Sequence, residues 1–455
     1  MTAIITDTLK KQLLLDIITD IDSSANDYYI GIGRSEVWNA TDAAPTPKNT
    51  QRDARNLGLS LQSVKAVADK TLCAPRTDWS SGATYSSLND DIEGHPVSAY
   101  YVFTDENHVY LCIQAGRNAA GNIVNSTVKP TGTSTKAFKT ADGYVWKFSY
   151  SIGALTASKF LSSNFLPVSF VVSTDSDSPA STVEQKSIQD AAVSGEIIGY
   201  TVTDGGTGYT STPNATIVGN GSTLAKADVT ISGGAVSKVD ARDSSGTLVF
   251  GAGYTYASVE LTGGGGTGAS IRPIFGPKAG LGADPRDDLR TRAIMFNSKP
   301  EGTEAGDFIV GNDFRQVSLI RNPLTHAGAK FSDNTGNTLN RLNLSTISSI
   351  FSADKTILGA TSGAKAYIDK VDSDNIYYHQ NETTGFTQFD EAESISETDG
   401  SGAGVLALAG DDVDTDAFIV GEMDPLSGDV LYIDNRAAVS RSAEQTEDIK
   451  IVIQL

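Results

Sequence analysis

Residues 99–113 read AYYVFTDENHVYLCI. Two runs of aromatic and β-branched residues, AYYVF and VYLCI, flank a polar stretch, which is the pattern of two strands joined by a hairpin turn at Asn107-His108. Similar runs follow at 144–148 (YVWKF) and 168–172 (VSFVV), separated by turn-forming residues. The segment around these runs therefore predicts a mainly β core.

Two helices are expected beside this core. Residues 6–21 place apolar side chains at helical spacing, and so do residues 49–70, where Leu57, Leu61, Val64 and Val67 share one face. Gly58 weakens the second helix by roughly 1 kcal/mol relative to Ala. A strand is expected at 28–33. The last run, IKIVI at 449–453, alternates and predicts a final strand with one buried face.

The composition changes near residue 195, where Gly, Thr and Ser become dense. GTGYT at 206–210 returns as GAGYT at 251–255, and each copy is followed by a strand and a glycine-dense turn. Such a near-repeat predicts a small inserted β domain. A second glycine-rich region contains the strand-like run AYIDKV at 366–371.

These observations give a domain organisation and a fold class. The fold class is mainly β, with a layered β-sandwich core, a few peripheral helices and inserted small β domains. The expected order is the N-terminal part of the core at 1–194, an inserted domain at 195–276, the core again at 277–353, a second insertion at 354–412 and C-terminal core strands at 413–455.

The formal net charge of −20 argues against nucleic acid and against anionic lipid as partners. No run reaches the ~18 apolar residues that span a bilayer. The apolar run at 13–15 is followed at once by Asp16, unlike a signal peptide. We therefore expect a chain made and folded in a cytoplasm, with no membrane partner. Cys73 and Cys112 are expected to be small core residues, because two cysteines make no disulfide scaffold.

Motifs that could carry chemistry are weak. Asp412, Asp414 and Asp416 have the spacing of a calcium loop, but Ala417 and Met423 replace its glycine and glutamate. The glycine run at 263–268 lacks the Lys-Ser/Thr of a phosphate-binding loop, and Gly31 and Gly33 lack a third glycine, so a turn and a strand are expected there. The histidines, His95, His108, His326 and His379, have no partner nearby in sequence. We expect no catalytic, cofactor-binding or metal-binding residues.

Several segments resemble one family in the same order along the chain. They are GRSEVW at 33–38, PRTDW at 75–79 with Tyr85 beyond, DGYVW at 142–146, FRQVSLIRNPL at 314–324, SGDVLYIDNR at 427–436 and QTEDIKI at 445–451. They are similar to signatures of the baseplate wedge subunit family of T4-type contractile-tailed phages, the eighth gene product. The resemblance covers roughly residues 5–175, 285–325 and 418–455. It departs at Asp429, which stands for Glu, and at Ala437-Ala438, which replace prolines.

The resemblance implies a non-enzymatic structural protein of the virion tail baseplate, assembled in the host cytoplasm. It implies a homodimer that also contacts other baseplate wedge proteins, and no cofactor. On this basis Arg34 and Glu36 are expected to form buried or interfacial charge pairs. Trp38, Trp79 and Trp146 are expected to be core or dimer-interface anchors rather than ligand-stacking residues.

Two other functions stay open. Aromatic β domains bind glycans, so Tyr200, Tyr209, Tyr254 and Tyr256 offer a host-glycan-binding tail module, although cross-strand packing is the expected role of these residues. A tail-associated hydrolase would require acidic residues gathered in a cleft. From their polar composition, the two insertions are expected to lie away from the dimer interface.

Overall fold

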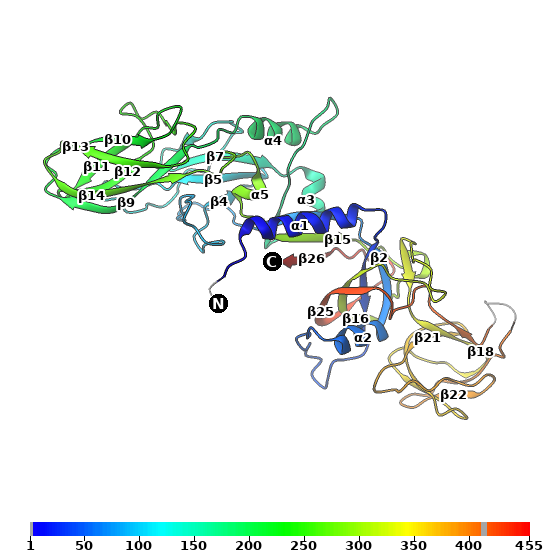
Figure 1. Ribbon diagram of the computed structural model, residues 1–455. Coiled ribbons are helices and arrows are strands. Elements are labelled where there is room, and N and C mark those ends of the chain that lie inside the picture. The colour runs from blue at the N-terminus through cyan, green and yellow to red at the C-terminus, as the bar shows by residue number, and fades with distance from the viewer. Residues whose placement is uncertain (1–2, 411–415) are drawn as a thin grey trace. The chain divides into compact units, whose positions relative to one another are not determined.

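The computed structural model describes residues 3–410 and 416–455 and confirms a mainly β fold. The chain forms two compact units (Figure 1). Unit 1 consists of Met1–Leu15, Thr71–Met295 and Val452–Leu455, and unit 2 consists of Asp16–Lys70 and Phe296–Ile451. The helices in the described ranges are α1 (Asp7–Asp22), α2 (Gln51–Leu59), α3 (Ala154–Phe160), α4 (Ala180–Asp190), α5 (Pro285–Asp288) and the 3-10 turn η1 (Glu304–Gly306).

The central sheet of unit 1 contains the runs that predicted the β core. Its order is β4-β5-β7-β6, with β4 at Tyr101–Phe103, β5 at His108–Gln114, β7 at Val145–Ser151 and β6 at Phe138–Lys139. β4 and β5 form the predicted hairpin, and Asn107 in its turn has a left-handed φ of 61°. Both faces of β7 are buried, so this sheet lies inside unit 1 rather than at its surface.

The strand predicted at 168–172 is wrong. The actual strand, β8, is Phe165–Val168, and it is the edge of the four-stranded sheet β26-β15-β3-β8. The other members are β26 (Ile449–Gln454), β15 (Ala293–Ser298) and β3 (Asp69–Pro75). Beyond Val168, two glutamines of α4 take the backbone groups: Gln185 donates to Ser169 O, and Gln189 both donates to Val171 O and accepts from its N–H. These side chains replace the ladder partners of a strand.

The helix predicted over 49–70 is correct only in its first half. Thr50 caps α2 by accepting from the Asp53 N–H at 3.1 Å, but the helix ends at Leu59. The chain then continues as β2 (Leu61–Ala66), which pairs with β1 (Tyr28–Gly33). Leu57, Leu61 and Val64 are buried and Val67 is partly buried, but the four do not share one helical face, because Leu61 and Val64 belong to β2 and Val67 follows it.

The glycine-rich repeat folds into three strand pairs related by an internal exchange. They are β9 (Ile197–Thr207) with β14 (Thr267–Phe275), β10 (Asn214–Gly219) with β13 (Ala257–Thr262), and β11 (Asp228–Ser232) with β12 (Ala235–Asp240). If β9, β10 and β11 are exchanged for β12, β13 and β14 respectively, the same three pairs result. The copies therefore pair with each other rather than within themselves.

The tyrosine of each copy packs against the glycine-dense turn of the other copy. A Cβ on Gly266 would lie 2.5 Å from the Tyr209 ring, and a Cβ on Gly221 would lie 2.2 Å from the Tyr254 ring. Tyr209 and Tyr254 are both buried. Only glycine therefore leaves room for the two rings, which explains why both turns are rich in it.

Unit 2 begins with a five-stranded sheet of order β17-β2-β1-β16-β25. β17 is Thr335–Asn337, β16 is Asp313–Arg321 and β25 is Asp429–Ser440. β1 runs antiparallel to both neighbours and is buried along its whole length. Gly33 ends it, where an added Cβ would lie 2.4 Å from the Ser60 carbonyl oxygen, so the close approach of two backbones requires glycine there.

Six further strands of unit 2 close into a small barrel. Their order is β21-β20-β19-β22-β23-β18, and an additional pairing between β21 and β18 completes the ring, with β24 (Phe418–Ile419) attached to β18. The members are β18 (Asn340–Ser349), β19 (Thr356–Gly359), β20 (Lys365–Asp372), β21 (Asn375–His379), β22 (Ser394–Glu397) and β23 (Ala403–Leu406). Leu342, Ile357, Ile368 and Ile376 fill its core. Closure removes the exposed edges that an open sheet would present.

Candidate functional site

Asp369 is the centre of the most densely bonded polar site in unit 2. It lies on β20 at a β-bulge, because the register with β21 slips between Ile368 and Lys370. Ile368 packs in the barrel core, whereas Asp369 lies on the opposite face of β20 with His379, as strand alternation requires, and is buried there against residues of the five-stranded sheet and its loops. The carboxylate is completely buried.

Three polar side chains contact this buried carboxylate, and a fourth binds the backbone carbonyl of the same residue. Ser35 Oγ donates to it at 2.5 Å, Gln62 Nε2 donates at 3.2 Å, and His379 Nδ1 lies 2.6 Å away. Asn312 Nδ2 donates to the backbone carbonyl of Asp369 at 2.7 Å, so the carbonyl released by the bulge is also satisfied. The donors come from the five-stranded sheet and its loops as well as from the barrel, so Asp369 joins the two.

His379, at the end of β21, lies between two carboxylates. Nδ1 faces Asp369, and Nε2 lies 3.7 Å from Glu36 Oε2, which is an ion-pair distance longer than a hydrogen bond. Burial lowers the pKa of His379, but Asp369 and Glu36 outweigh this effect and raise the pKa to about 10. His379 is therefore an imidazolium at neutral pH, and its charge is compensated on both sides.

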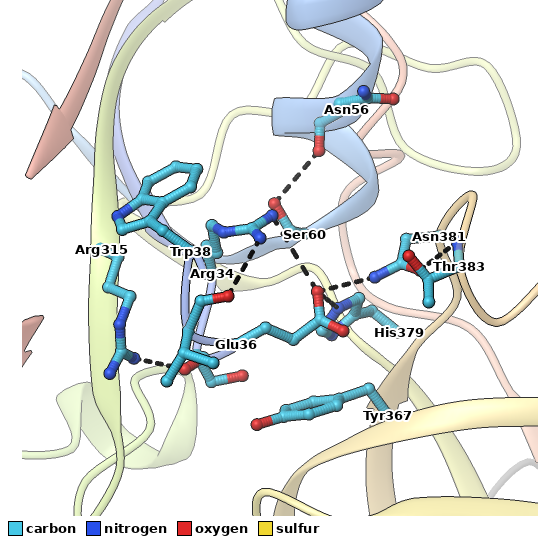
Figure 2. Close-up of polar contacts among 12 residues, drawn as sticks. Arg34, Glu36, Trp38, Asn56, Ser60, Arg315, Tyr367, His379, Asn381 and Thr383 are labelled. Atoms are coloured by element: carbon cyan, nitrogen blue, oxygen red, sulfur yellow. Dashed lines mark hydrogen bonds and ion pairs between the residues drawn. The ribbon is translucent and has the colours of Figure 1, made fainter. Parts of the chain in front are cut away.

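Glu36 connects this histidine to the loop that follows β1. Figure 2 shows its carboxylate directed at His379 and Asn381, and Asn381 Nδ2 donates to it at 2.7 Å. Burial acts to raise the pKa of Glu36, but these partners, together with Arg34, hold the pKa below its usual value. Arg34 Nη1 lies 4.0 Å from Glu36, and its guanidinium lies 4.2 Å from the centre of the Trp38 ring. The expected charge pair of Arg34 and Glu36 is present.

Two neighbouring strands hold the same loop from the other side. Arg315 on β16 binds the Asp42 carboxylate with Nε at 2.9 Å and also donates to the Ser35 carbonyl. Trp38 Nε1 donates to the Arg436 carbonyl on β25 at 3.0 Å. We call Arg34, Ser35, Glu36, Asp369 and His379 the buried charge cluster. The segments at 33–38, 314–324 and 427–436 thus meet around it.

The buried charge cluster does not have the geometry of an activated nucleophile. Ser35 Oγ donates its hydrogen bond to Asp369, and the histidine faces two carboxylates instead of the hydroxyl. A serine nucleophile requires the histidine itself within hydrogen-bond reach of the hydroxyl. The ion pairs of His379 with Asp369 and Glu36 instead hold the end of β21 against β20 and the loop that follows β1.

In unit 1, two other segments meet through Ser126. Trp79 Nε1 donates to Ser126 Oγ at 3.1 Å, and that hydroxyl donates to Asp142 at 3.2 Å. Asp142 also accepts from the Thr140 hydroxyl and from the N–H groups of Thr127 and Val128, and these bonds hold its pKa below the usual range although burial acts to raise it. Trp146 is fully buried and stacks on Tyr144 with ring centres 5.6 Å apart. Trp146 is therefore the core anchor that was expected.

Of the other histidines, His95 and His108 belong to unit 1 and His326 belongs to unit 2. His95 contacts the Leu289 carbonyl at 2.9 Å, and His108 contacts the Tyr110 hydroxyl at 3.2 Å. His326 lines the same small pocket as His379. Sequence reasoning missed Asp369 and its pairing with His379, since its partners Ser35, Gln62 and His379 all lie outside the run AYIDKV.

The structure also places the tyrosines, glycines and cysteines that the sequence analysis named as candidates. Tyr209 and Tyr254 are buried packing residues, Tyr200 is partly buried, and Tyr256 is 65% exposed. The glycine run at 263–268 forms the turn between β13 and β14 at 263–266, where Gly263, Gly264 and Gly265 have positive φ, and its last two residues begin β14. Cys73 and Cys112 are buried free thiols. Asp412 and Asp414 lie outside the described residues.

Within the described ranges, no three His, Cys, Asp or Glu residues gather closely enough to hold a metal ion. A search of the same ranges finds no helix with the length and apolar character needed to cross a bilayer. Comparison with known proteins finds no family model that matches the chain and no curated protein that matches it.

Proposed function

We propose that this protein is a structural subunit of the baseplate wedge of a contractile phage tail. In this proposal it acts as a homodimer that holds neighbouring wedge proteins in place, and it resides in the virion tail baseplate after assembly in the host cytoplasm. In this role the protein acts by binding its neighbours through its interfaces, and it catalyses no reaction.

The observation that carries the proposal is the convergence of the segments that resemble the wedge family. GRSEVW at 33–38 supplies Ser35 and Glu36 to the buried charge cluster. FRQVSLIRNPL at 314–324 supplies Arg315, and SGDVLYIDNR at 427–436 supplies the carbonyl that accepts from Trp38. Segments far apart in the chain therefore share one network.

The polar groups of these segments are used inside the fold. Gln316 Nε2 donates to Asn435 Oδ1 at 2.8 Å, and Asn435 donates to the Pro45 carbonyl at 2.9 Å. Side chains engaged in this way fix the position of strands and loops. A subunit that must present the same surface to several neighbours needs that rigidity, which supports a scaffolding role.

The same pattern occurs in unit 1, where PRTDW at 75–79 and DGYVW at 142–146 meet through Ser126. Arg76 pairs with Asp78 at 2.7 Å and donates to the Ser162 carbonyl at 2.9 Å. In both units, the segments that resemble the wedge family therefore form hydrogen bonds and ion pairs within the fold. This common use supports one structural role for the whole chain.

The first test is the mass of the purified chain by light scattering after size-exclusion chromatography. A dimeric wedge subunit has a mass near twice 47.8 kDa. The dimer is then mixed with purified wedge proteins of the same phage, and co-elution is expected. A monomer that co-elutes with none of them contradicts the proposal.

A further inference from the structure

A pocket of about 600 Å³ opens in unit 1 beside β7. Its walls come from the loop before β6, the residues that follow α4, and the loop at 246–250 of the inserted domain. Phe138, Leu248, Phe250 and Leu281 make it largely apolar, and Lys147 and Glu196 are the charged groups inside it. This combination of apolar walls and few polar groups is typical of a small-molecule site.

Lys147 is a buried cation with spare hydrogen-bonding capacity. The side chain is only 6% exposed, and Nζ donates to the Thr135 carbonyl at 2.7 Å. An ammonium has three N–H groups, so two remain without a protein acceptor among the described residues. Burial lowers the pKa of Lys147, and the charges of Glu196 and Asp288 act against that effect.

Glu196 lines the same pocket and does not close on the lysine. Among the described residues its carboxylate has no hydrogen bond and no ion pair within 4.0 Å, although it feels the charge of Lys147. Burial raises the pKa of Glu196 to about 7, and Lys147 acts against that rise. At neutral pH the group is therefore both a donor and an acceptor.

We propose that this pocket binds a small carboxylate-bearing molecule with an apolar face and a hydroxyl group, the chemistry of a uronic acid. Its carboxylate pairs with Lys147, and its hydroxyl exchanges hydrogen bonds with Glu196. The C–H face of its ring packs on Phe138 and Phe250. Lys136 and Lys139, which are exposed at the rim, attract the anion on a chain of net charge −20.

The presence of both Lys147 and Glu196 in the pocket favours a monoanion over a dianion. Inorganic phosphate would bring a second negative charge next to Glu196 and has no apolar face for the two phenylalanines. A neutral sugar would leave the buried ammonium without its counter-charge. The inference is independent of the baseplate proposal, because a ligand pocket can exist on a scaffold or on any other protein.

The test is isothermal titration calorimetry of the full chain with D-glucuronate, D-glucose and inorganic phosphate. Glucuronate is expected to bind, with D-glucose and phosphate weaker by about tenfold or more. Lys147→Met keeps the length of the side chain and removes its charge, and should weaken glucuronate binding by about tenfold or more. Lys226→Met, which changes an exposed lysine of the inserted domain outside the pocket, should leave binding unchanged.

Thermal unfolding of each variant shows that it is folded before binding is compared. Glu196→Ala is the second variant, at a partly exposed position, and should also weaken glucuronate binding. Absence of binding by the native chain overturns the proposal, as does a Lys147→Met variant that binds like the native chain. Phosphate that binds as tightly as glucuronate overturns the ligand class.

Discussion

Asp369 illustrates how one residue can determine whether the barrel of unit 2 stays attached to its neighbouring sheet. Its carboxylate is the shared acceptor of Ser35, Gln62 and His379. Asp369→Ala would leave the His379 imidazolium facing only Glu36. Removal of one partner of a buried ion pair costs about 3–5 kcal/mol. We expect that loss of stability in unit 2, measured by hydrogen exchange of peptides from β20 and β21.

Asp372→Ala is the matched control for this experiment. Asp372 lies on the same strand, is largely exposed and pairs with Lys370 at 3.4 Å on the surface. Its loss should change stability by no more than about 0.5 kcal/mol. Equal effects of the two substitutions would contradict a central role for Asp369.

His379 should make the stability of unit 2 depend on pH. Its folded-state pKa is raised to about 10 from an ordinary value of 6.5. A raised histidine pKa contributes stability that is fully present below pH 6.5 and is lost as the pH rises through 10. The stability difference between the native chain and His379→Gln should therefore shrink from pH 6.5 to pH 10, as measured by chemical denaturation. A difference that does not vary with pH would refute the assignment.

Trp146 is the residue on which the core of unit 1 depends most directly. It is fully buried and contacts Tyr85 and Tyr144, with ring centres 5.6 Å from each. Trp146→Ala should cost ~3–5 kcal/mol, because the cavity cannot be filled by neighbours held in their own hydrogen bonds. Chemical denaturation measures this value, and a loss below ~1 kcal/mol would mean that the site collapses freely.

At the scale of elements, the exchanged repeat makes a paired prediction. Gly221→Ala and Gly266→Ala each place a methyl group against a buried tyrosine ring of the other copy. Each should cost about 1–3 kcal/mol, with similar values because the two sites are related by the internal exchange. Gly199→Ala is the control, since its Cβ would make an ordinary 3.5 Å contact with Ile274. Thermal unfolding compares all three, and opposite behaviour of Gly221 and Gly266 would contradict the symmetry.

The positions at which α2 and β8 end could not be predicted from the local sequence pattern. The apolar spacing at 57–64 suits a continuous helix, yet β1 offers a ladder that β2 completes from Leu61 onward. The run at 168–172 has strand composition, yet Gln185 and Gln189 of α4 take its backbone hydrogen bonds. In both cases the deciding partner is distant in sequence, so a window of neighbouring residues does not contain it.

At the scale of the whole molecule, the inserted domain can be removed at a defined point. Gly199 on β9 pairs directly with Ile274 on β14. Replacing residues 200–273 by Asn-Gly would therefore close a two-residue hairpin and keep Ile198 and Ile274 in the core. We expect a folded chain that is less stable, because Leu248 and Phe250 no longer pack against that core.

This shortened chain also tests the expectation that the insertion lies away from the dimer interface. If the native chain is a dimer, the shortened chain should have twice its own monomer mass by light scattering. Circular dichroism shows whether it is folded. A folded monomer would place the interface on the inserted domain.

The sequence by itself determined the β-rich class, the hairpin at 99–113, helix α1, the strand at 449–453 and the presence of a repeat. These features depend on the alternation, composition and spacing of nearby residues, which the chain carries wherever it folds. It also pointed to Arg34, Glu36 and Trp146 through the resemblance, although it did not state their partners.

Only the tertiary structure decided the buried charge cluster, the exchange of the two repeat copies and the closure of the barrel. Asp369 lies on the face of β20 that also carries its contact with His379, and its donors Ser35 and Gln62 lie more than three hundred residues away in the chain. Barrel closure depends on the pairing of β18 with β21. Such contacts form because a buried polar group must find its hydrogen-bond partners within the protein, and packing in space decides which residues those partners are.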